Sequence, residues 1–171
     1  CPDSGADLVL KVQYPELAGV IDDDFNAVVR MLVLARWVRA GRELDDWMED
    51  LRVQLHHEID YERELAMTKE ARQRFGAPGG PYYVPDVFEE FSRDTVLALE
   101  YVAGRRVSDP EVAALPQSRR NALARAMLEL FFIELYDWGV LQTDPNFGNY
   151  LVRMREDQGK GKGPAKDQLV L

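Results

Sequence analysis

The chain carries the sequence QTDPNFGNYLV at residues 142–152, between a long apolar helical pattern and a short apolar strand pattern. Asp144 precedes Asn149 by five residues, which is the D-x-x-x-x-N spacing of a phosphoryl-transfer loop. In such a loop the Asp accepts or orients the proton of the attacking hydroxyl, and the Asn holds a magnesium ion against the nucleotide phosphates. The same spacing also occurs in ordinary turns, where Asp and Asn side chains bond to their own backbone. The spacing alone leaves both interpretations open.

Composition sets the limits for the rest of the chain. Its 171 residues, 46% of them hydrophobic, suffice for one packed domain or part of one. The net charge of -9 argues against nucleic acid as a partner. A single cysteine, Cys1, excludes an intramolecular disulfide and a thiolate metal cluster. Because the chain starts at Cys1 and ends in the apolar run of residues 168–171, we expect it to be an excerpt from a longer protein.

The hydrophobic pattern predicts a mixture of helices and strands. Helices are expected from Asp22–Asp24 to Gly41, from about Glu43 to Phe75, and from about Ser118 to Gly139. Strands are expected over residues 8–15, 82–88, 95–102, 150–152 and 168–171, with the second and third as an antiparallel pair. The glycine-rich segment 159–164 has the composition of a flexible turn between the last two strands.

Two of the helices are expected to bury an apolar stripe. In the long helix the stripe consists of Leu44, Trp47, Met48, Leu51, Leu55 and Ile59. In the last helix the buried side is expected to contain Leu123, Met127, Leu128, Phe131, Leu135 and Tyr136.

Within the long helix the pattern becomes acidic at residues 58–64, where Asp60 and Glu64, four apart, share one face. Charged residues on helices are most often simply solvated. Lys11, however, lies among aliphatic residues of the first strand and needs a counter-charge, because buried ammonium groups are rarely left unpaired. This requirement favours a functional interpretation of the acidic set.

These residues resemble the UbiB/AarF (ABC-one) atypical kinase family over nearly the whole chain. Residues 10–15, LKVQYP, look like the strand with the nucleotide-binding lysine of that family. Residues 58–64, EIDYERE, look like its E-x-D-Y-x-x-E helix signature, and residues 142–146, QTDPN, look like its catalytic loop in the form typical of the coenzyme Q branch.

The resemblance implies roles for individual residues. Lys11 would contact nucleotide phosphates and pair with Glu64, while Glu58 and Asp60 would face a lysine of an N-terminal K-x-G-Q motif. Glu100 and Val102, in the hinge, would lie next to the adenine. In the catalytic loop, Asp144 would be the catalytic residue and Asn149 would be a magnesium ligand. The implied cofactors are ATP and Mg2+.

The implied fold is α+β, a partial protein-kinase-like fold. Residues 1–102 would be the end of the small lobe with its long helix, and residues 103–171 the start of the helical large lobe, cut before Asp-Phe-Gly. We therefore expect the 171 residues to be inactive by themselves.

Departures from ordinary protein kinases predict the type of chemistry. Gln142 and Thr143 replace the usual His-Arg, and Asn146 replaces a lysine near the transferred phosphate, so one stabiliser of transition-state charge is missing. We expect ATP hydrolysis, or phosphorylation of a small or lipid-like molecule, rather than protein phosphorylation.

The resemblance extends to biology. It implies support of ubiquinone (coenzyme Q) biosynthesis, with quinone-like lipid precursors and other coenzyme Q biosynthesis proteins as partners, and peripheral membrane association. The implied location is intracellular: the matrix side of the mitochondrial inner membrane in a eukaryote, the cytoplasm or inner membrane in a bacterium. Two alternatives stay open, namely a small-molecule phosphotransferase of the aminoglycoside or choline kinase type and a non-catalytic nucleotide-binding scaffold.

Overall fold

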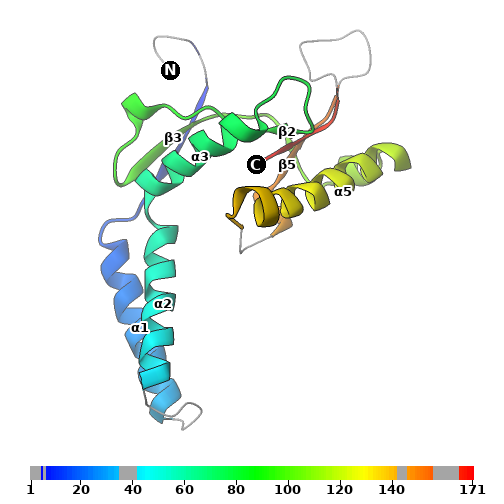
Figure 1. Ribbon diagram of the computed structural model, residues 1–171. Helices are drawn as coiled ribbons and strands as arrows, with labels where there is room; N and C mark the ends of the chain where they lie inside the picture. The colour runs from blue at the N-terminus through cyan, green and yellow to red at the C-terminus, as the bar shows by residue number, and fades with distance from the viewer. Residues whose placement is uncertain (1–4, 6, 35–41, 142–145, 156–165) are drawn as a thin grey trace. The chain divides into compact units, whose positions relative to one another are not determined.

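The computed structural model describes residues 5, 7–34, 42–141, 146–155 and 166–171, and Figure 1 shows their course. The chain forms two compact units, each made of separate segments. The helical-hairpin unit consists of Val9–Met67 and Val87–Leu99, and the sheet unit of Cys1–Leu8, Thr68–Asp86 and Glu100–Leu171. No helix among the described residues is long and apolar enough to cross a membrane.

The helical-hairpin unit contains a long pair of helices, α1 (Leu17–Leu34) and α2 (Arg42–Glu58), which lie side by side (Figure 1). Helix α1 begins before the predicted start at Asp22–Asp24, directly after a turn in which the Leu17 amide donates to the Tyr14 carbonyl. The two helices meet partly through polar groups: Asp22 accepts from His56 at 3.2 Å, and Arg52 donates to Asn26 at 2.9 Å.

The predicted burial of the long-helix stripe is wrong for two of its members. Trp47 is 54% exposed and Leu55 39% exposed, whereas Met48, Leu51 and Ile59 are half-buried. The side chain of Leu44 lies outside the described residues. A periodic pattern identifies a face of a helix, but only a neighbouring element decides how much of that face is covered.

The prediction of one helix from Glu43 to Phe75 is also wrong, because α2 ends at Glu58 and a separate helix α3 (Tyr61–Phe75) follows. The Asp60 carboxylate accepts a hydrogen bond from the Arg63 amide at 2.9 Å, which is the bond of a helix N-cap. The break therefore coincides with the acidic motif.

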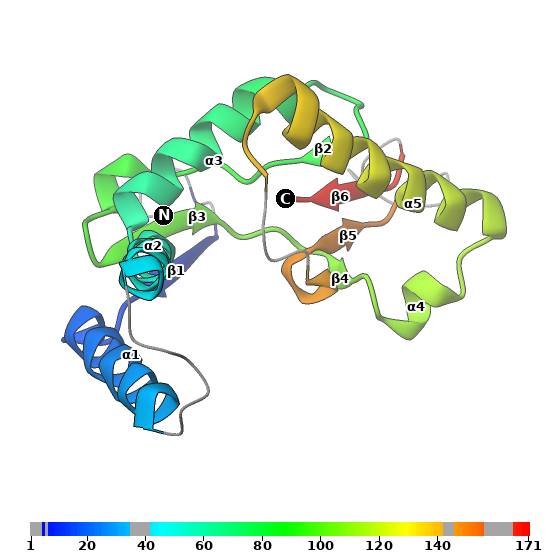
Figure 2. The ribbon, with the colours of Figure 1, turned by 60° about the horizontal axis from the view of Figure 1, so that its bottom comes forward.

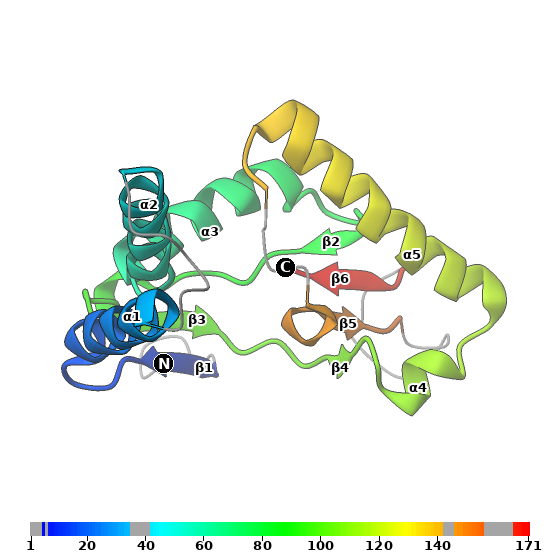
Figure 3. The same cartoon turned by 90° about the horizontal axis from the view of Figure 1, so that it is seen from below.

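The sheet unit is built on four strands that lie side by side in the order β2–β6–β5–β4 (Figure 3). They are β2 (Tyr82–Tyr83), β4 (Arg105–Arg106), β5 (Leu151–Arg153) and β6 (Gln168–Val170). The predicted hairpin of the last two strands is confirmed, since β5 and β6 pair antiparallel. Strand β4 and the short helix α4 (Pro110–Ala113) were not expected from the sequence.

The predicted antiparallel pair of residues 82–88 and 95–102 forms only in part. Strand β3 (Val96–Glu100) lies in a two-stranded sheet with β1 (Leu8–Val12), and Val87 makes one antiparallel bridge to Leu99. A short 3-10 helix, η1 (Glu89–Phe91), lies between them. Strand β2 instead runs parallel to β6. The proline at position 85, which has no amide hydrogen to donate, follows the end of β2.

Helix α5 (Gln117–Phe132) runs along the four-stranded sheet, as Figure 2 shows, and continues as a π-helix, η2 (Ile133–Trp138). Its buried residues are Leu123, Ala126 and Leu130, so Leu123 was predicted correctly. The rest of the predicted buried side is half-buried at Met127 and exposed at Leu128, Phe131, Leu135 and Tyr136. Apolar residues surround much of this helix, and periodicity alone does not single out one face.

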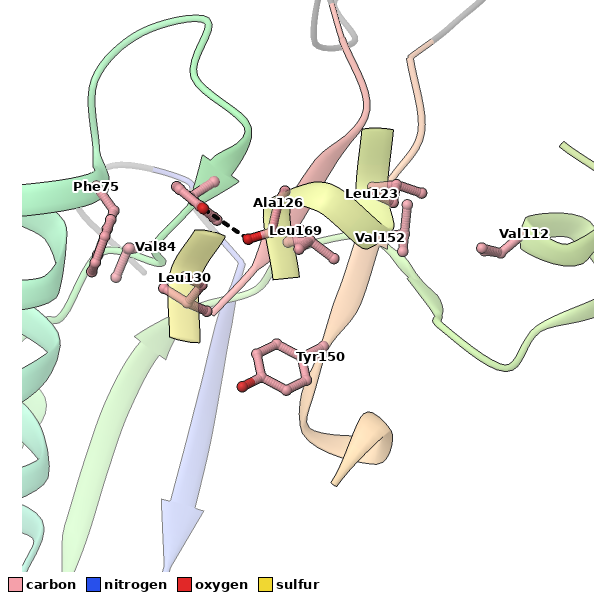
Figure 4. Close-up of a cluster of buried hydrophobic side chains, with 10 residues drawn as sticks. Phe75, Val84, Val112, Leu123, Ala126, Leu130, Tyr150, Val152 and Leu169 are labelled. Atoms are coloured by element: carbon pink, nitrogen blue, oxygen red, sulfur yellow. Dashed lines mark hydrogen bonds between the residues drawn. The ribbon is translucent and has the colours of Figure 1, made fainter. Parts of the chain in front are cut away.

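The small Ala126 lies where the helix approaches the sheet. The Tyr82 hydroxyl donates to the Ala126 carbonyl at 2.8 Å (Figure 4, dashed line). Burial, followed by the charges of Glu129 and Glu134, raises the pKa of Tyr82 to about 12, so this hydroxyl stays a donor at neutral pH. Tyr82 and Ala126 share the core of the sheet unit with Phe75, Val84, Val112, Leu123, Leu130, Tyr150, Val152 and Leu169 (Figure 4).

Candidate functional site

The ammonium of Lys11 on β1 forms an ion pair with Glu64 on α3. Its Nζ atom donates to both carboxylate oxygens of Glu64, at 2.8 and 2.6 Å, and lies 5.1 Å from the centre of the Tyr61 ring. The two side chains are 48% and 34% exposed. An ion pair this exposed contributes only about 0–1 kcal/mol to stability. Its effect is to orient an ammonium group that a ligand can still reach.

Local structure explains how Glu64 comes to face Lys11. The cap at Asp60 starts α3, and Glu64 lies in the first turn, where its amide donates to the Asp60 carbonyl at 3.0 Å. Tyr61 is buried and anchors this turn. Directly after the end of β1 at Val12, Gln13 donates from its side chain to the Ile59 carbonyl. The chain therefore contacts the α2–α3 junction at Lys11 and again at Gln13.

The three acids of the motif are in different situations. Glu64 pairs with Lys11, as expected, and Glu58 does not share that contact, because it is the exposed last residue of α2. Asp60 is exposed and bonded to the backbone of its own helix. That Glu58 and Asp60 face a lysine of an upstream segment stays a prediction.

Glu100, the last residue of β3, is held within the sheet unit by its side chain and by its backbone. The Tyr83 hydroxyl donates to its two carboxylate oxygens at 2.6 and 2.8 Å, and the Asp86 amide donates to Oε2 at 3.1 Å. Its own amide donates to the Asp86 carbonyl at 2.8 Å. Val102, two residues on, is half-buried. Contact of Glu100 and Val102 with adenine stays a prediction.

The predicted catalytic loop is described only in its second half, and Asp144 lies outside the described residues together with Gln142 and Thr143. Asn146 caps a 3-10 turn, η3 (Phe147–Asn149), because its side-chain oxygen accepts from the Gly148 amide at 2.9 Å. Asn149 is exposed and follows in that turn. The catalytic role of Asp144 therefore stays a prediction.

A magnesium ion takes hard oxygen ligands, and Asn149 offers one amide oxygen. Within the described ranges, no group of three or more His, Cys, Asp and Glu side chains is placed to hold a metal ion. The role of Asn149 as a magnesium ligand stays a prediction.

The sequence did not predict one set of contacts, which lies at the end of the π-helix. Trp138, at the end of the π-helix, donates from its indole nitrogen to Glu70 Oε1 at 2.7 Å, and its ring lies 5.4 Å from the Arg74 guanidinium. Phe75 contacts the same ring edge-on, with centroids 5.9 Å apart. The spacing of Glu70 and Arg74, four residues apart on one helix face, indicates an ion pair between them. No sequence pattern indicates that the Trp138 indole contacts both.

Comparison with known proteins gives a consistent result. The family model described as "ABC1 atypical kinase-like domain" matches residues 2–170. The chain is 34% identical over 167 residues to the mitochondrial atypical kinase coq-8 of Caenorhabditis elegans, a match that covers 98% of the chain and 21% of that relative. It is 31% identical to the probable protein kinase UbiB of Cellvibrio japonicus, over 86% of the chain and 27% of that relative. The chain thus spans about a quarter of the length of these relatives.

Among solved structures, the complex of Rv3197 with erythromycin from Mycobacterium tuberculosis matches with a TM-score of 0.65. The two are 22% identical, and the match covers 85% of this chain and 36% of that one. This likeness bears on the fold alone. Together with the family match it confirms the predicted partial kinase-like fold.

Proposed function

Because this chain belongs to the ABC1 atypical kinase-like family, we propose that it forms the nucleotide-binding part of an atypical kinase or ATPase of the UbiB type. The observation that carries the proposal is the Lys11–Glu64 pair, with Nζ 2.6 Å from Oε2. A half-exposed ammonium group, oriented by a carboxylate, is suited to contact nucleotide phosphates. In this proposal ATP is the cofactor of the site, and the backbone after Glu100 contacts its adenine.

Magnesium would be held in part by Asn149, and bound there it would neutralise charge on the phosphates. Asp144 would accept the proton of the attacking hydroxyl or water. Asn146 supports a restricted chemistry, because its side chain is a neutral amide engaged in capping the η3 turn. With no lysine at this position, transfer to protein hydroxyl groups lacks one source of charge stabilisation.

We assign the physiological role from the relatives. Their names describe mitochondrial atypical kinases and bacterial UbiB proteins, which supports a role in coenzyme Q biosynthesis. The substrates would be quinone-like lipid precursors that the protein phosphorylates or extracts from a membrane surface, with other coenzyme Q biosynthesis proteins as partners. The location would be the matrix side of the mitochondrial inner membrane or, in a bacterium, the cytoplasm and inner membrane.

The test uses the complete protein with Asp144→Asn, Lys11→Ala and the control Lys166→Ala, which alters an exposed lysine far along the chain. Magnesium-dependent ATP hydrolysis is measured with and without anionic vesicles. Asp144→Asn should reduce turnover on the order of 100-fold or more, as expected for loss of a proton acceptor, and leave nucleotide binding intact. Lys11→Ala should weaken nucleotide binding, and Lys166→Ala should change neither quantity.

Unchanged turnover in Asp144→Asn would contradict the catalytic assignment. Nucleotide binding without any turnover in the unmodified protein would instead favour the non-catalytic scaffold.

A further inference from the structure

A cluster of charged and aromatic side chains surrounds Glu100 inside the sheet unit. The carboxylate of Glu100 accepts from the Tyr83 hydroxyl at 2.6 and 2.8 Å and from the Asp86 amide at 3.1 Å. Hydrogen bonds to an ionised acceptor are shorter and stronger than those between neutral groups. The Glu100 amide also donates to Asp86, so side chain and backbone are fixed against the same short segment.

The partners of Glu100 are themselves held in place. The Arg153 guanidinium lies 3.9 Å from the centre of the Tyr83 ring, within the range of a cation–π contact, and donates to Gln168 at 3.3 Å. Arg72 forms an ion pair with Asp86 at 2.8 Å and donates to the Val84 carbonyl at 2.5 Å. The segment that binds Glu100 is therefore anchored at both of its ends.

Tyr83 is suited to remain a donor. Burial, then the hydrogen bond and charge of Glu100, raise the pKa of the Tyr83 phenol, and the charges of Arg153 and Arg72 act in the opposite direction. The hydroxyl stays protonated at neutral pH, which a bond to a carboxylate requires.

We infer that Tyr83 is a positioning residue that holds Glu100 and thereby fixes the backbone of residues 100–102 for recognition of the adenine ring. The inference rests on the proposed nucleotide site and adds to it a residue that does not touch the nucleotide. Without the Tyr83 hydroxyl, the carboxylate loses its shortest bond, and the position of residues 100–102 then depends more on the bonds that the Glu100 and Tyr101 amides donate to the Asp86 and Asp7 carbonyls, at 2.8 and 2.9 Å. Affinity for the base then falls, whereas contacts with the phosphates, which involve Lys11, are unaffected.

The experiment compares ligands with and without a base in the complete protein. Tyr83→Phe removes the hydroxyl and keeps the ring beside Arg153. Dissociation constants are measured for Mg-ADP, Mg-GDP and inorganic tripolyphosphate. We expect about 10-fold weaker ADP binding, equivalent to about 1.4 kcal/mol, a smaller preference for ADP over GDP, and unchanged tripolyphosphate binding.

Two controls separate positioning from a general loss of structure. Tyr82→Phe removes a hydroxyl from the neighbouring residue, whose bond goes to Ala126 on α5, so it should lower thermal stability without changing the preference for ADP. Glu100→Gln keeps an oxygen that accepts from Tyr83, so it should weaken ADP binding less than Glu100→Ala does.

The inference is overturned if Tyr83→Phe binds ADP like the unmodified protein, or if it loses affinity for ADP and tripolyphosphate equally. In either case weaker binding in Lys11→Ala would show that the nucleotide site itself stands. If the unmodified protein binds none of the three ligands, the proposed function fails and the inference fails with it.

Discussion

At the scale of single residues, two ion pairs of this chain differ in effect because they differ in exposure. The side chains of Lys11 and Glu64 are 48% and 34% exposed, whereas those of Arg119 and Asp167 are 15% and 7% exposed. Water screens the first pair, so this pair contributes little to the free energy of unfolding. The second pair is largely shielded from water, and removal of one partner of a buried ion pair costs several times more stability than removal of an exposed one.

Asp167→Asn tests this difference. Arg119 donates to the carboxylate at 2.7 Å, and the Arg155 amide donates at 2.9 Å. At pH 7 the substitution should lower the free energy of unfolding of the complete protein by about 3–5 kcal/mol. Glu111→Gln, which removes a partner from the exposed Arg105–Glu111 pair, should change it by less than about 1 kcal/mol. Urea unfolding measures both values.

The same pair predicts a pH dependence. Burial alone would raise the pKa of the Asp167 carboxyl, but the hydrogen bonds and the positive charges of Arg119 and Arg155 together outweigh burial and lower this pKa below its ordinary value of 3.8. Because the folded pKa is depressed, the stabilisation is fully present above the unfolded pKa and is lost as the pH falls through the folded pKa. The difference in stability between the unmodified protein and Asp167→Asn should therefore shrink below about pH 4. A difference that is constant down to pH 2 would contradict the assignment.

At the scale of elements, the break between α2 and α3 decides where the motif acids lie. A continuous helix would have placed Glu58 and Glu64 by helical geometry alone, whereas the break at Ile59–Asp60 starts a new helix and sets Glu64 in its first turn. The apolar periodicity of the sequence runs through this break, so the sequence predicted one continuous helix. Periodicity reports which residues are buried, not where the backbone hydrogen bonds stop.

Substitutions at Asp60 separate the cap from the charge. Asp60→Ala should lower the free energy of unfolding by about 1 kcal/mol, because the Arg63 amide loses its acceptor. Asp60→Asn keeps an acceptor oxygen and should retain most of the stability. Glu58→Ala, at the exposed end of α2, should change stability by less than about 0.5 kcal/mol. Equal loss in the Ala and Asn variants, measured by thermal or urea unfolding, would exclude the cap.

The last hairpin could be predicted from the sequence for physical reasons, whereas the ion pair of Lys11 with Glu64 was implied by the family resemblance. The expectation that Lys11 is buried and therefore needs a counter-charge is wrong, because its side chain is 48% exposed. The hairpin of β5 and β6 connects strands that are near in sequence, with a glycine-rich segment between them. By contrast, the contact of Tyr83 with Glu100 depends on how residues after β2 return toward β3, which no local pattern encodes.

At the scale of the whole molecule, segments that pack together are often distant in the sequence. Strand β2 pairs with β6 near the end of the chain, so the sheet unit closes only when these two segments, which are distant in the sequence, meet. The helical-hairpin unit likewise combines residues 9–67 with the distant segment 87–99. Pairings between distant segments leave no periodic trace in sequence, and the predicted pairing of residues 82–88 with residues 95–102 placed Tyr82 and Tyr83 wrongly for this reason.

The two units should respond separately to loss of core side chains. Leu169 in the sheet unit and Leu97 in the helical-hairpin unit are both fully buried, and both lie on strands. Leucine-to-alanine substitution at such a site removes about 2–5 kcal/mol of stability, and the two substitutions are chemically matched. If each unit keeps its own core, Leu169→Ala should speed amide hydrogen exchange of residues 100–141 and 166–171, and Leu97→Ala should speed exchange in residues 9–34 and 46–67. Hydrogen exchange of the complete protein, followed by mass spectrometry, measures both patterns in one experiment. Equal acceleration of both regions by either substitution would show that the units unfold as one body, because cooperative unfolding spreads the loss of one contact over every residue that it includes.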